Sequence, residues 1–262
     1  MQKRIDVYLF EKGLAPSREK ARLMVMAGAV FVNGTLCSKP SFQITEGAKV
    51  YVKQADAFVS RGGKKLLKAL EAFDLQLNGV TAIDIGASTG GFTDCMLKNG
   101  AAFVYAVDVG YGQLAWSLRQ DSRVGVMERQ NARHLKRGMF EKPASFAAID
   151  VSFISLKLIL PAVAAVLHPP FTIIALIKPQ FEAGRESVGK KGVVREKAVH
   201  KAVIEDVIKS ARETGLKLCG LDYSPIKGPE GNIEYLVCLR DSGEDMQPDT
   251  DSAVNAAHQH AK

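Results

Sequence analysis

Cysteine is scarce in this sequence and is not clustered. The four cysteines, Cys37, Cys95, Cys219 and Cys238, lie far apart, and the chain contains no C-x-x-C pair and no group of cysteines with histidines. This spacing argues against a zinc site and against a disulfide framework. Unpaired cysteines also fit a reducing compartment, so we expect a cytoplasmic protein without a bound metal.

Long hydrophobic runs are also missing. Charged residues between Lys3 and Lys12 interrupt any apolar stretch near the N-terminus, so no signal peptide is predicted. Residues 158–177 contain no Lys, Arg, Asp or Glu and approach the length of a transmembrane helix. The prolines at 161, 169 and 170 break this stretch, which we interpret as a helix, a turn and a buried strand. The sequence therefore predicts no membrane span.

Acidic residues are outnumbered by basic ones over most of the chain. The 262 residues have a net charge of +7, and their length has room for one large and one small domain. Residues 1–53 contain nine basic and four acidic residues, and residues 54–240 contain 25 and 19, an excess that favours a polyanionic partner. Residues 241–262 contain one basic and five acidic residues without an apolar pattern, so we expect a disordered tail.

Residues 1–53 have the pattern of a small α+β domain of their own. Two short helices are predicted at residues 4–11 and 17–28, the second with a serine N-cap. A strand, a hairpin turn at Asn33-Gly34 and a further strand at residues 49–53 follow.

This order resembles the α-L RNA-binding domain of the small-subunit ribosomal protein number four and of pseudouridine synthases. The matching stretches are R-I-D-V-Y-L, S-R-E-K-A-R and A-V-F-V-N-G. In that family two helices present a rigid basic face to folded RNA, which is recognised mainly through its phosphates and its shape. The alternative is a spacer with a solvated charged face. The RNA contacts predicted for this chain are Arg4, Arg18, Lys20, Arg22 and, in the following segment, Arg61.

The stretch from Val80 to Cys95 organises the rest of the chain. It reads V-T-A-I-D-I-G-A-S-T-G-G-F-T-D-C, which is a strand ending in an acid, a glycine-rich turn and the start of a helix. Glycine lets a ligand approach where a Cβ would collide, and a helix N-terminus adds unpaired N–H groups. The spacing differs from the G-x-G-x-x-G of dinucleotide sites. The carboxylate of Asp84 would repel a pyrophosphate but suits the ammonium of a methionine moiety.

A second predicted strand ends at Asp108, 24 residues after Asp84, where an acid can accept hydrogen bonds from both hydroxyls of a ribose. We therefore predict an S-adenosylmethionine site; the alternative is a tight strand–helix turn with a surface acid. The predicted cofactor contacts are Asp84, Gly86, Ala87, Ser88, Gly90, Gly91, Phe92, Asp108, Asn131 and Asp150.

Strand and helix patterns alternate from Val80 onward. Seven strands are predicted, at residues 81–85, 103–108, 124–127, 146–151, 171–177, 216–223 and 233–239, with helices at 60–73, 93–99, 114–120, 156–167 and 196–214. This order predicts a doubly wound, Rossmann-like α/β sheet typical of S-adenosylmethionine-dependent methyltransferases. Only a turn separates the last two strands, so we expect an antiparallel edge hairpin. The predicted domain spans residues 60–240, after a linker at 54–59.

Three charged residues lie at predicted strand ends, where open α/β sheets bind their ligands. Asp150 ends the fourth strand and Lys178 the fifth, and Glu234 begins the last strand, near the same edge if that strand is antiparallel. Lys65 lies on the helix before the first strand. A lysine after a buried strand is costly unless it is paired. The alternative is a buried Asp150–Lys178 ion pair that only supports the sheet.

The order Lys, Asp, Lys, Glu resembles the FtsJ-type ribose 2′-O-methyltransferases. Its combination with an α-L domain resembles more closely the TlyA family, bacterial rRNA methyltransferases also named hemolysins. The resemblance covers roughly residues 1–240 and implies that Lys65, rather than Lys64, forms a catalytic tetrad with Asp150, Lys178 and Glu234. It also implies 2′-O-methylation of cytidine in ribosomal RNA, with ribosomal RNA or ribosomal subunits as partners. The matching stretches include V-S-R-G-G-K-K-L, D-V-S-F-I-S-L, L-I-K-P-Q-F-E-A-G-R and G-P-E-G-N-I-E-Y-L.

In this interpretation Lys178 would orient or deprotonate the ribose hydroxyl, Asp150 would fix Lys178, and Glu234 would hold Lys65. The competing hypotheses are a small-molecule methyltransferase, a membrane-lysing hemolysin and an inactive RNA-binding protein. The basic N-terminal block argues against the first, the missing span and export signal against the second, and the intact tetrad against the third. Residues 181–195 form a basic, glycine-bearing segment that predicts a lid, an RNA clamp or a mobile loop.

Overall fold

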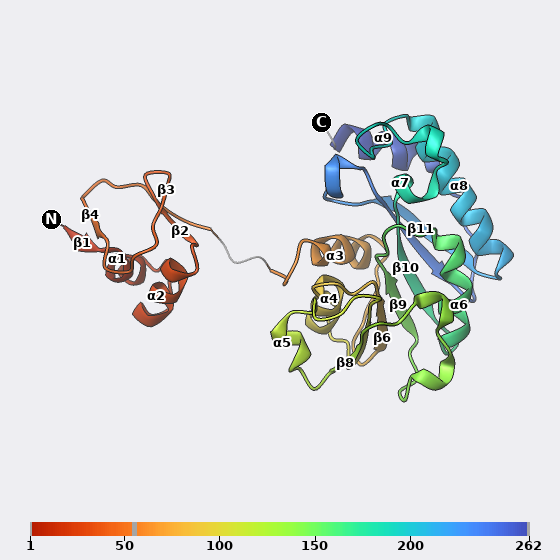
Figure 1. Ribbon diagram of the computed structural model, residues 1–262, viewed down its shortest axis with the longest axis horizontal. Helices are drawn as coiled ribbons and strands as arrows, with labels where there is room; N and C mark the ends of the chain where they lie inside the picture. The colour runs from red at the N-terminus through yellow and green to blue at the C-terminus, as the bar shows by residue number, and fades with distance from the viewer. Residues whose placement is uncertain (1, 54–56, 261–262) are drawn as a thin grey trace. The chain divides into compact units, whose positions relative to one another are not determined.

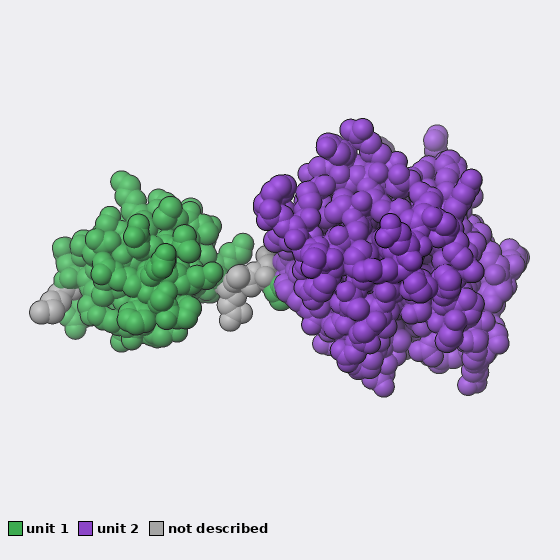
Figure 2. Space-filling view, turned by 90° about the horizontal axis from the view of Figure 1, so that it is seen from below, with its two compact units in different colours: residues 1–57 green, residues 58–262 purple. Residues whose placement is uncertain are grey.

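The computed structural model describes residues 2–53 and 57–260, and the chain divides into two compact units, residues 1–57 and 58–262 (Figure 2). The predicted linker at 54–59 crosses this division, and its residues 54–56 lie outside the described residues. Phe58, which the sequence predicts in the linker, instead belongs to the core of the second unit. Its ring is buried against Gly63, where a Cβ would collide with it, so the second unit begins earlier than expected.

The first unit contains the two predicted helices and the hairpin. Ile5, Leu9 and Val25 form its core together with residues of the strands. The Ser17 hydroxyl accepts a hydrogen bond from the Lys20 N–H and so caps the second helix, as the sequence predicts. The elements are β1 (Lys3–Arg4), α1 (Ile5–Glu11), α2 (Arg18–Met26), β2 (Val30–Val32), β3 (Thr35–Leu36), β4 (Gln43–Ile44) and β5 (Val50–Val52).

The second unit is built on a seven-stranded sheet in the order β11-β12-β10-β9-β6-β7-β8 (Figure 1). Its strands are parallel except β12, which pairs antiparallel with both β10 and β11. The predicted antiparallel edge hairpin is therefore confirmed. The strands are β6 (Thr81–Ile85), β7 (Phe103–Val107), β8 (Val124–Met127), β9 (Phe146–Ile149), β10 (Thr172–Ile177), β11 (Lys217–Tyr223) and β12 (Tyr235–Arg240).

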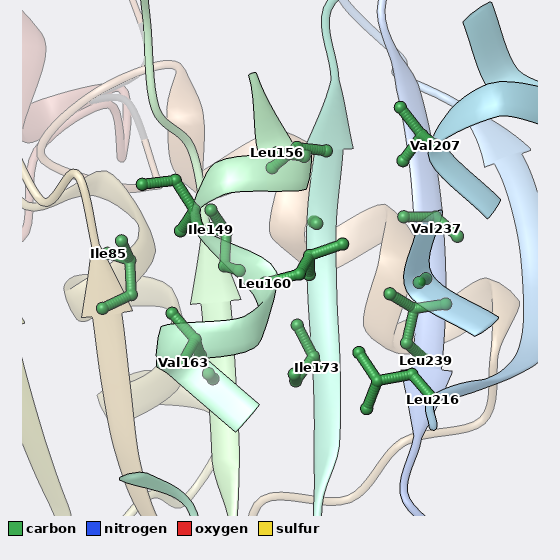
Figure 3. Packing of buried hydrophobic residues seen from close by; sticks show 14 of the residues in the cluster. Ile85, Ile149, Leu156, Leu160, Val163, Ile173, Val207, Leu216, Val237 and Leu239 are labelled. Carbon is green, nitrogen blue, oxygen red and sulfur yellow. The ribbon is translucent and has the colours of Figure 1, made fainter. Parts of the chain in front are cut away.

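Successive side chains of a strand point to opposite faces of the sheet, and in these strands both sets are apolar. Helices therefore cover both faces. In β10, Ile173 and Ile177 face one cluster while Ile174 and Leu176 face the other. Figure 3 shows Leu160 and Val163 packed over the strands of the first face. The helices are α3 (Gly62–Ala72), α4 (Gly91–Lys98) and α5 (Trp116–Arg119) against one cluster, α6 (Leu160–Val166) and α8 (Lys197–Glu213) against the other, and the short α7 (Pro179–Glu182) after β10.

The C-terminal segment differs from the disordered tail that we expected at 241–262. Residues 250–260 form α9 (Thr250–His260), and the side chains of Val254 and Ala257 are buried in the core beside α8 and β11. The helix presents a narrow stripe of small apolar residues, which is too weak a pattern to stand out among the polar residues around it. Burial against the edge of the sheet therefore orders a segment whose composition resembles that of a tail. Residues 261–262 lie outside the described part of the chain.

Candidate active site

The four charged residues predicted as a tetrad lie together at the carboxyl ends of the parallel strands. Lys65 extends from α3, Asp150 follows β9, Lys178 follows β10, and Glu234 directly precedes β12. The antiparallel register pairs Ile177 with Tyr235, so the residues next to them, Lys178 and Glu234, meet at the same edge. Lys64, the alternative to Lys65, is exposed to solvent.

The cluster is a row of alternating charges. The Lys178 Nζ lies 2.5 Å from Asp150 Oδ1, and the Lys65 Nζ lies 3.8 Å from Asp150 Oδ2 and 2.5 Å from Glu234 Oε2. The side chains are largely or fully buried, with Asp150 the most exposed at 20%. Two ammonium groups and two carboxylates balance each other, which is the condition for burying charges at such a site.

A cleft of about 340 Å³ opens onto the tetrad. The glycine loop forms one wall, through the predicted cofactor residues Gly86, Ala87, Ser88, Gly91 and Phe92. Gly86 has a φ of +84°, and a Cβ at this position would lie 2.5 Å from the backbone oxygen of Asp150. Only glycine therefore lets the loop run this close to the strand end that supplies Asp150.

A second cleft of about 430 Å³ shares Gly86, Ser88 and Asp150 with the first. Two further predicted cofactor residues, Asp108 and Asn131, line it. The Asp108 carboxylate accepts hydrogen bonds from the N–H groups of Ser88 and Gly110, each at 2.7 Å, and so fixes the shape of the glycine loop. The Asn131 side chain accepts one from the Arg133 N–H.

Asp84 has a different environment from the one we predicted. Its carboxylate is fully buried, and Oδ2 accepts hydrogen bonds from the N–H and the hydroxyl of Thr93 at 2.8 and 2.6 Å. Burial raises the pKa of the Asp84 carboxyl to about 7, while the two hydrogen bonds from Thr93 act in the opposite direction. Asp84 thus holds the start of α4 against β6 and lines neither cleft. Gly90 also lines neither, because its Cα packs against Leu114 and Leu118.

Two residues beside Asp150, Ser152 and Phe153, also belong to the site and were not predicted from the sequence. The Ser152 hydroxyl lies 3.1 Å from the Lys178 Nζ and accepts a hydrogen bond from it. Phe153 is 90% exposed with a φ of +63°, and its ring lies 4.9 Å from that of Phe181. A bulky side chain held in the left-handed region and left in water is a common sign of function. Both residues lie in the D-V-S-F-I-S-L stretch, so their position after Asp150 was the available signal.

Arg61 is brought to the cleft by a contact distant in sequence. Its guanidinium donates a hydrogen bond of 2.9 Å to the Lys227 carbonyl oxygen, and both residues line the cleft. The segment 226–229 also lines this cleft. The predicted RNA contact at Arg61 therefore lies beside the tetrad.

In the first unit, Arg4, Arg18 and Arg22 line one open depression of about 480 Å³ together with Asp6 and Glu19. The Asp6 carboxylate lies between two of them: Arg4 donates two hydrogen bonds to it, and the Arg18 Nε lies 3.7 Å away. Lys20 is exposed on the same helix, α2. This concentration of guanidinium groups forms a candidate site for phosphates.

Asp6 should make the stability of the first unit depend on acidity. The hydrogen bonds from Arg4 hold the pKa of the Asp6 carboxyl below its usual value of 3.8. The stabilisation of the folded first unit by Asp6 is therefore present above pH 3.8. It is lost as the pH falls toward the lower pKa of the folded state. We expect this contribution to the free energy of unfolding to be at most about 1 kcal/mol, because both arginines are exposed to water. Calorimetry of the full chain should show that the Tm of the first unit falls less between pH 7 and pH 3 in Asp6→Asn than in the wild type, because the asparagine amide does not titrate.

The segment at 181–195 is only partly an open loop. It contains the end of α7 and a 3₁₀ turn at Arg185–Ser187, and its last apolar residues, Val193 and Val194, are buried. Lys190 and Lys191 remain exposed. Glu182 anchors its start by accepting hydrogen bonds from the Ser155 hydroxyl and the Leu156 N–H.

Comparison with known proteins agrees with this architecture. Residues 58–241 match the FtsJ-like methyltransferases, and residues 3–50 match the S4 domain. A Bacillus subtilis protein provisionally named an rRNA methyltransferase is 52% identical over 94% of this chain and 88% of its own length. The 16S/23S rRNA (cytidine-2′-O)-methyltransferase TlyA of Mycobacterium tuberculosis is 44% identical over 90% of this chain and 89% of its own. The chain belongs to the TlyA family of FtsJ-like methyltransferases.

This TlyA-family chain is also similar to solved structures. A Streptococcus thermophilus protein provisionally named a hemolysin superposes with a TM-score of 0.77 and 48% identity, over 99% of this chain and 96% of its own. Within the described residues of this TlyA-family chain, every helix is too short or too polar to cross a membrane. The same residues contain no group of His, Cys, Asp and Glu side chains that could hold a metal ion.

Proposed function

We propose that this TlyA-family enzyme transfers a methyl group from S-adenosylmethionine to the ribose 2′-hydroxyl of a cytidine in ribosomal RNA. The observation that supports this most is the buried row Lys178–Asp150–Lys65–Glu234 beside the glycine loop. The curated M. tuberculosis relative has this activity in its name, and the S4 domain is the part suited to folded RNA.

The residues present fit S-adenosylmethionine. The two clefts share Gly86, Ser88 and Asp150, so they adjoin each other, with the Asp108 carboxylate in one and the tetrad in the other. A carboxylate is a suitable acceptor for ribose hydroxyls, and Gly86 leaves room where a side chain would intrude. When bound, the cofactor supplies an electrophilic methyl group.

The tetrad would act on the ribose hydroxyl, which is a weak nucleophile. The Lys178 Nζ is the group best placed to orient the hydroxyl and, in its neutral amine form, to accept the hydroxyl proton, because Asp150 and Ser152 fix it at the cleft. Lys65 adds a second positive charge near Asp150, and Glu234 holds Lys65. Positioning of the hydroxyl then accounts for much of the rate increase.

Phe153 should contact the RNA substrate. Its exposed ring lies beside Phe181, whose ring centroid is 5.9 Å from the Lys178 Nζ, so the pair forms an aromatic surface near the tetrad. A base stacked on an aromatic side chain contributes about 1–3 kcal/mol, so Phe153→Ala should lower kcat/KM for RNA by about tenfold or more. Phe153 also lines the 430 Å³ cleft, so calorimetry with S-adenosylmethionine separates a loss of cofactor affinity from a loss of contact with the RNA.

Trp116→Ala is the matched control, because Trp116 is a 69% exposed aromatic residue on α5 that lines neither cleft. Equal losses in both variants would mean that Phe153 has no special contact with the substrate.

The test of the proposed function is transfer of radiolabelled methyl from S-adenosylmethionine to separated ribosomal subunits, followed by nucleoside analysis. A labelled 2′-O-methylcytidine is the expected product. Transfer to a base, to another nucleoside or to a small molecule would overturn the assignment. Cofactor binding without transfer to either subunit would do the same.

A further inference from the structure

The backbone of Val194 is held from both sides by two buried polar side chains, Asn232 and His200. The Val194 N–H donates to Asn232 Oδ1 at 3.2 Å, and the Val194 carbonyl oxygen accepts from His200 Nε2 at 3.1 Å. Since a carbonyl only accepts, Nε2 carries the proton, and Nδ1 accepts the hydrogen bond of 2.6 Å from the Tyr235 hydroxyl. Asn232, His200 and Tyr235 are at most 3% exposed.

Asn232 also connects the two segments that meet at the tetrad. Its Nδ2 donates to the Gly192 carbonyl oxygen at 2.9 Å, within the 181–195 segment. The backbone carbonyl oxygen of Asn232 accepts from the Gly228 N–H at 2.9 Å, and Nδ2 also donates to the Pro229 carbonyl oxygen at 3.3 Å, both in the segment that lines the cleft. Gly228 packs directly on Glu234, because a Cβ at Gly228 would collide with the carboxylate. Asn232 therefore fixes the surroundings of the carboxylate that holds Lys65, through its side chain and its backbone together.

We propose that Asn232 and the His200–Tyr235 pair are positioning residues that tie the 181–195 segment to Glu234 and thereby set the Lys65–Glu234 ion pair for methyl transfer. These three side chains line neither the 340 Å³ cleft nor the 430 Å³ cleft, so they act through Glu234. The inference rests on the proposed function. Buried hydrogen-bonded networks specify a single arrangement because each member is costly to leave unpaired.

Two variants test this role in the full-length protein. Asn232→Asp replaces the donor to Gly192 with an oxygen of nearly the same size, and Tyr235→Phe removes only the hydroxyl that binds His200. Tyr235→Phe is the milder change and keeps the test available if Asn232→Asp folds poorly. Tyr105→Phe is the matched control, since its buried hydroxyl accepts from the Lys142 N–H in the same core but away from the hairpin.

We expect kcat for methyl transfer to fall by about tenfold or more in both variants, because small displacements of a catalytic group cost rate rather than affinity. The cofactor Kd should stay within about twofold of wild type, because no network member contacts either cleft. Hydrogen exchange of the 181–195 segment should speed up in both variants and not in Tyr105→Phe.

Unchanged exchange in the segment, or a kcat loss as large in Tyr105→Phe, would overturn the proposal. A loss seen only in cofactor or RNA affinity would also overturn it, since the segment would then bind a ligand rather than position Glu234. If the wild-type protein transferred no methyl to either subunit, the proposed function would fail, while the exchange rates would still decide whether the network anchors the segment.

Discussion

Lys178→Ala is expected to lower the rate of methyl transfer by about 10²–10⁴-fold while leaving cofactor affinity near that of the wild type. The Lys178 ammonium is the buried positive group paired with Asp150 and Ser152 at the mouth of the cleft, so no neighbouring side chain replaces it at this position. Cofactor affinity should persist because the glycine loop and Asp108 belong to separate strand ends. Single-turnover transfer to ribosomal subunits and calorimetry with S-adenosylmethionine measure the two effects.

The control for this variant is Lys157→Ala, which removes a lysine paired with Asp206 on the surface. Its ion pair is largely exposed, and such pairs contribute about 0–1 kcal/mol. Near-normal transfer by Lys157→Ala with loss in Lys178→Ala would assign the effect to the tetrad. Transfer at the wild-type rate by Lys178→Ala would remove this residue from the mechanism.

Gly86→Ala should destabilise the second unit and weaken cofactor binding together. The new methyl group would lie 2.5 Å from the Asp150 carbonyl oxygen, and the residue would have to keep a φ of +84°. Either the loop or the end of β9 must move, which we expect to cost about 1–3 kcal/mol of unfolding free energy. Because Gly86 lines both clefts, the same displacement should weaken cofactor binding more than tenfold, or about 1.4 kcal/mol.

Gly112→Ala separates the cost of the collision with Asp150 from the cost of holding an alanine at a positive φ. Gly112 also has a positive φ, +74°, but nothing lies within 4 Å of the position of its Cβ. It should therefore show only the conformational cost of about 1 kcal/mol, with normal cofactor affinity. Thermal unfolding measures the loss of stability in the two variants, and calorimetry measures the loss of cofactor affinity. Equal losses in both variants would mean that the contact with Asp150 is unimportant.

Local patterns predicted the elements of this protein well. Strand alternation placed β6 to β12 within one or two residues of their observed bounds, and the Ser17 cap and the turn at Asn33-Gly34 formed as expected. Each of these signals acts within a few residues and reports which face is buried, so a sequence contains it directly. The α9 helix was not predicted, because its apolar stripe is too narrow to indicate a helix by itself. The stripe has a role only when it packs against the edge of the sheet.

The sequence by itself determined which residue types stand at the strand ends: an acid after β9, a lysine after β10 and a glutamate before β12. Only the tertiary structure decided their partners. Glu234 lies beside Lys178 because the antiparallel register of β12 brings Tyr235 beside Ile177. Lys65 meets Glu234 across 169 positions of the chain because α3 packs against β12. The same holds for Asp84, whose carboxylate turned out to bind Thr93 rather than face the cleft. Strand register and loop path set such pairings, and neither is contained in any short stretch of sequence.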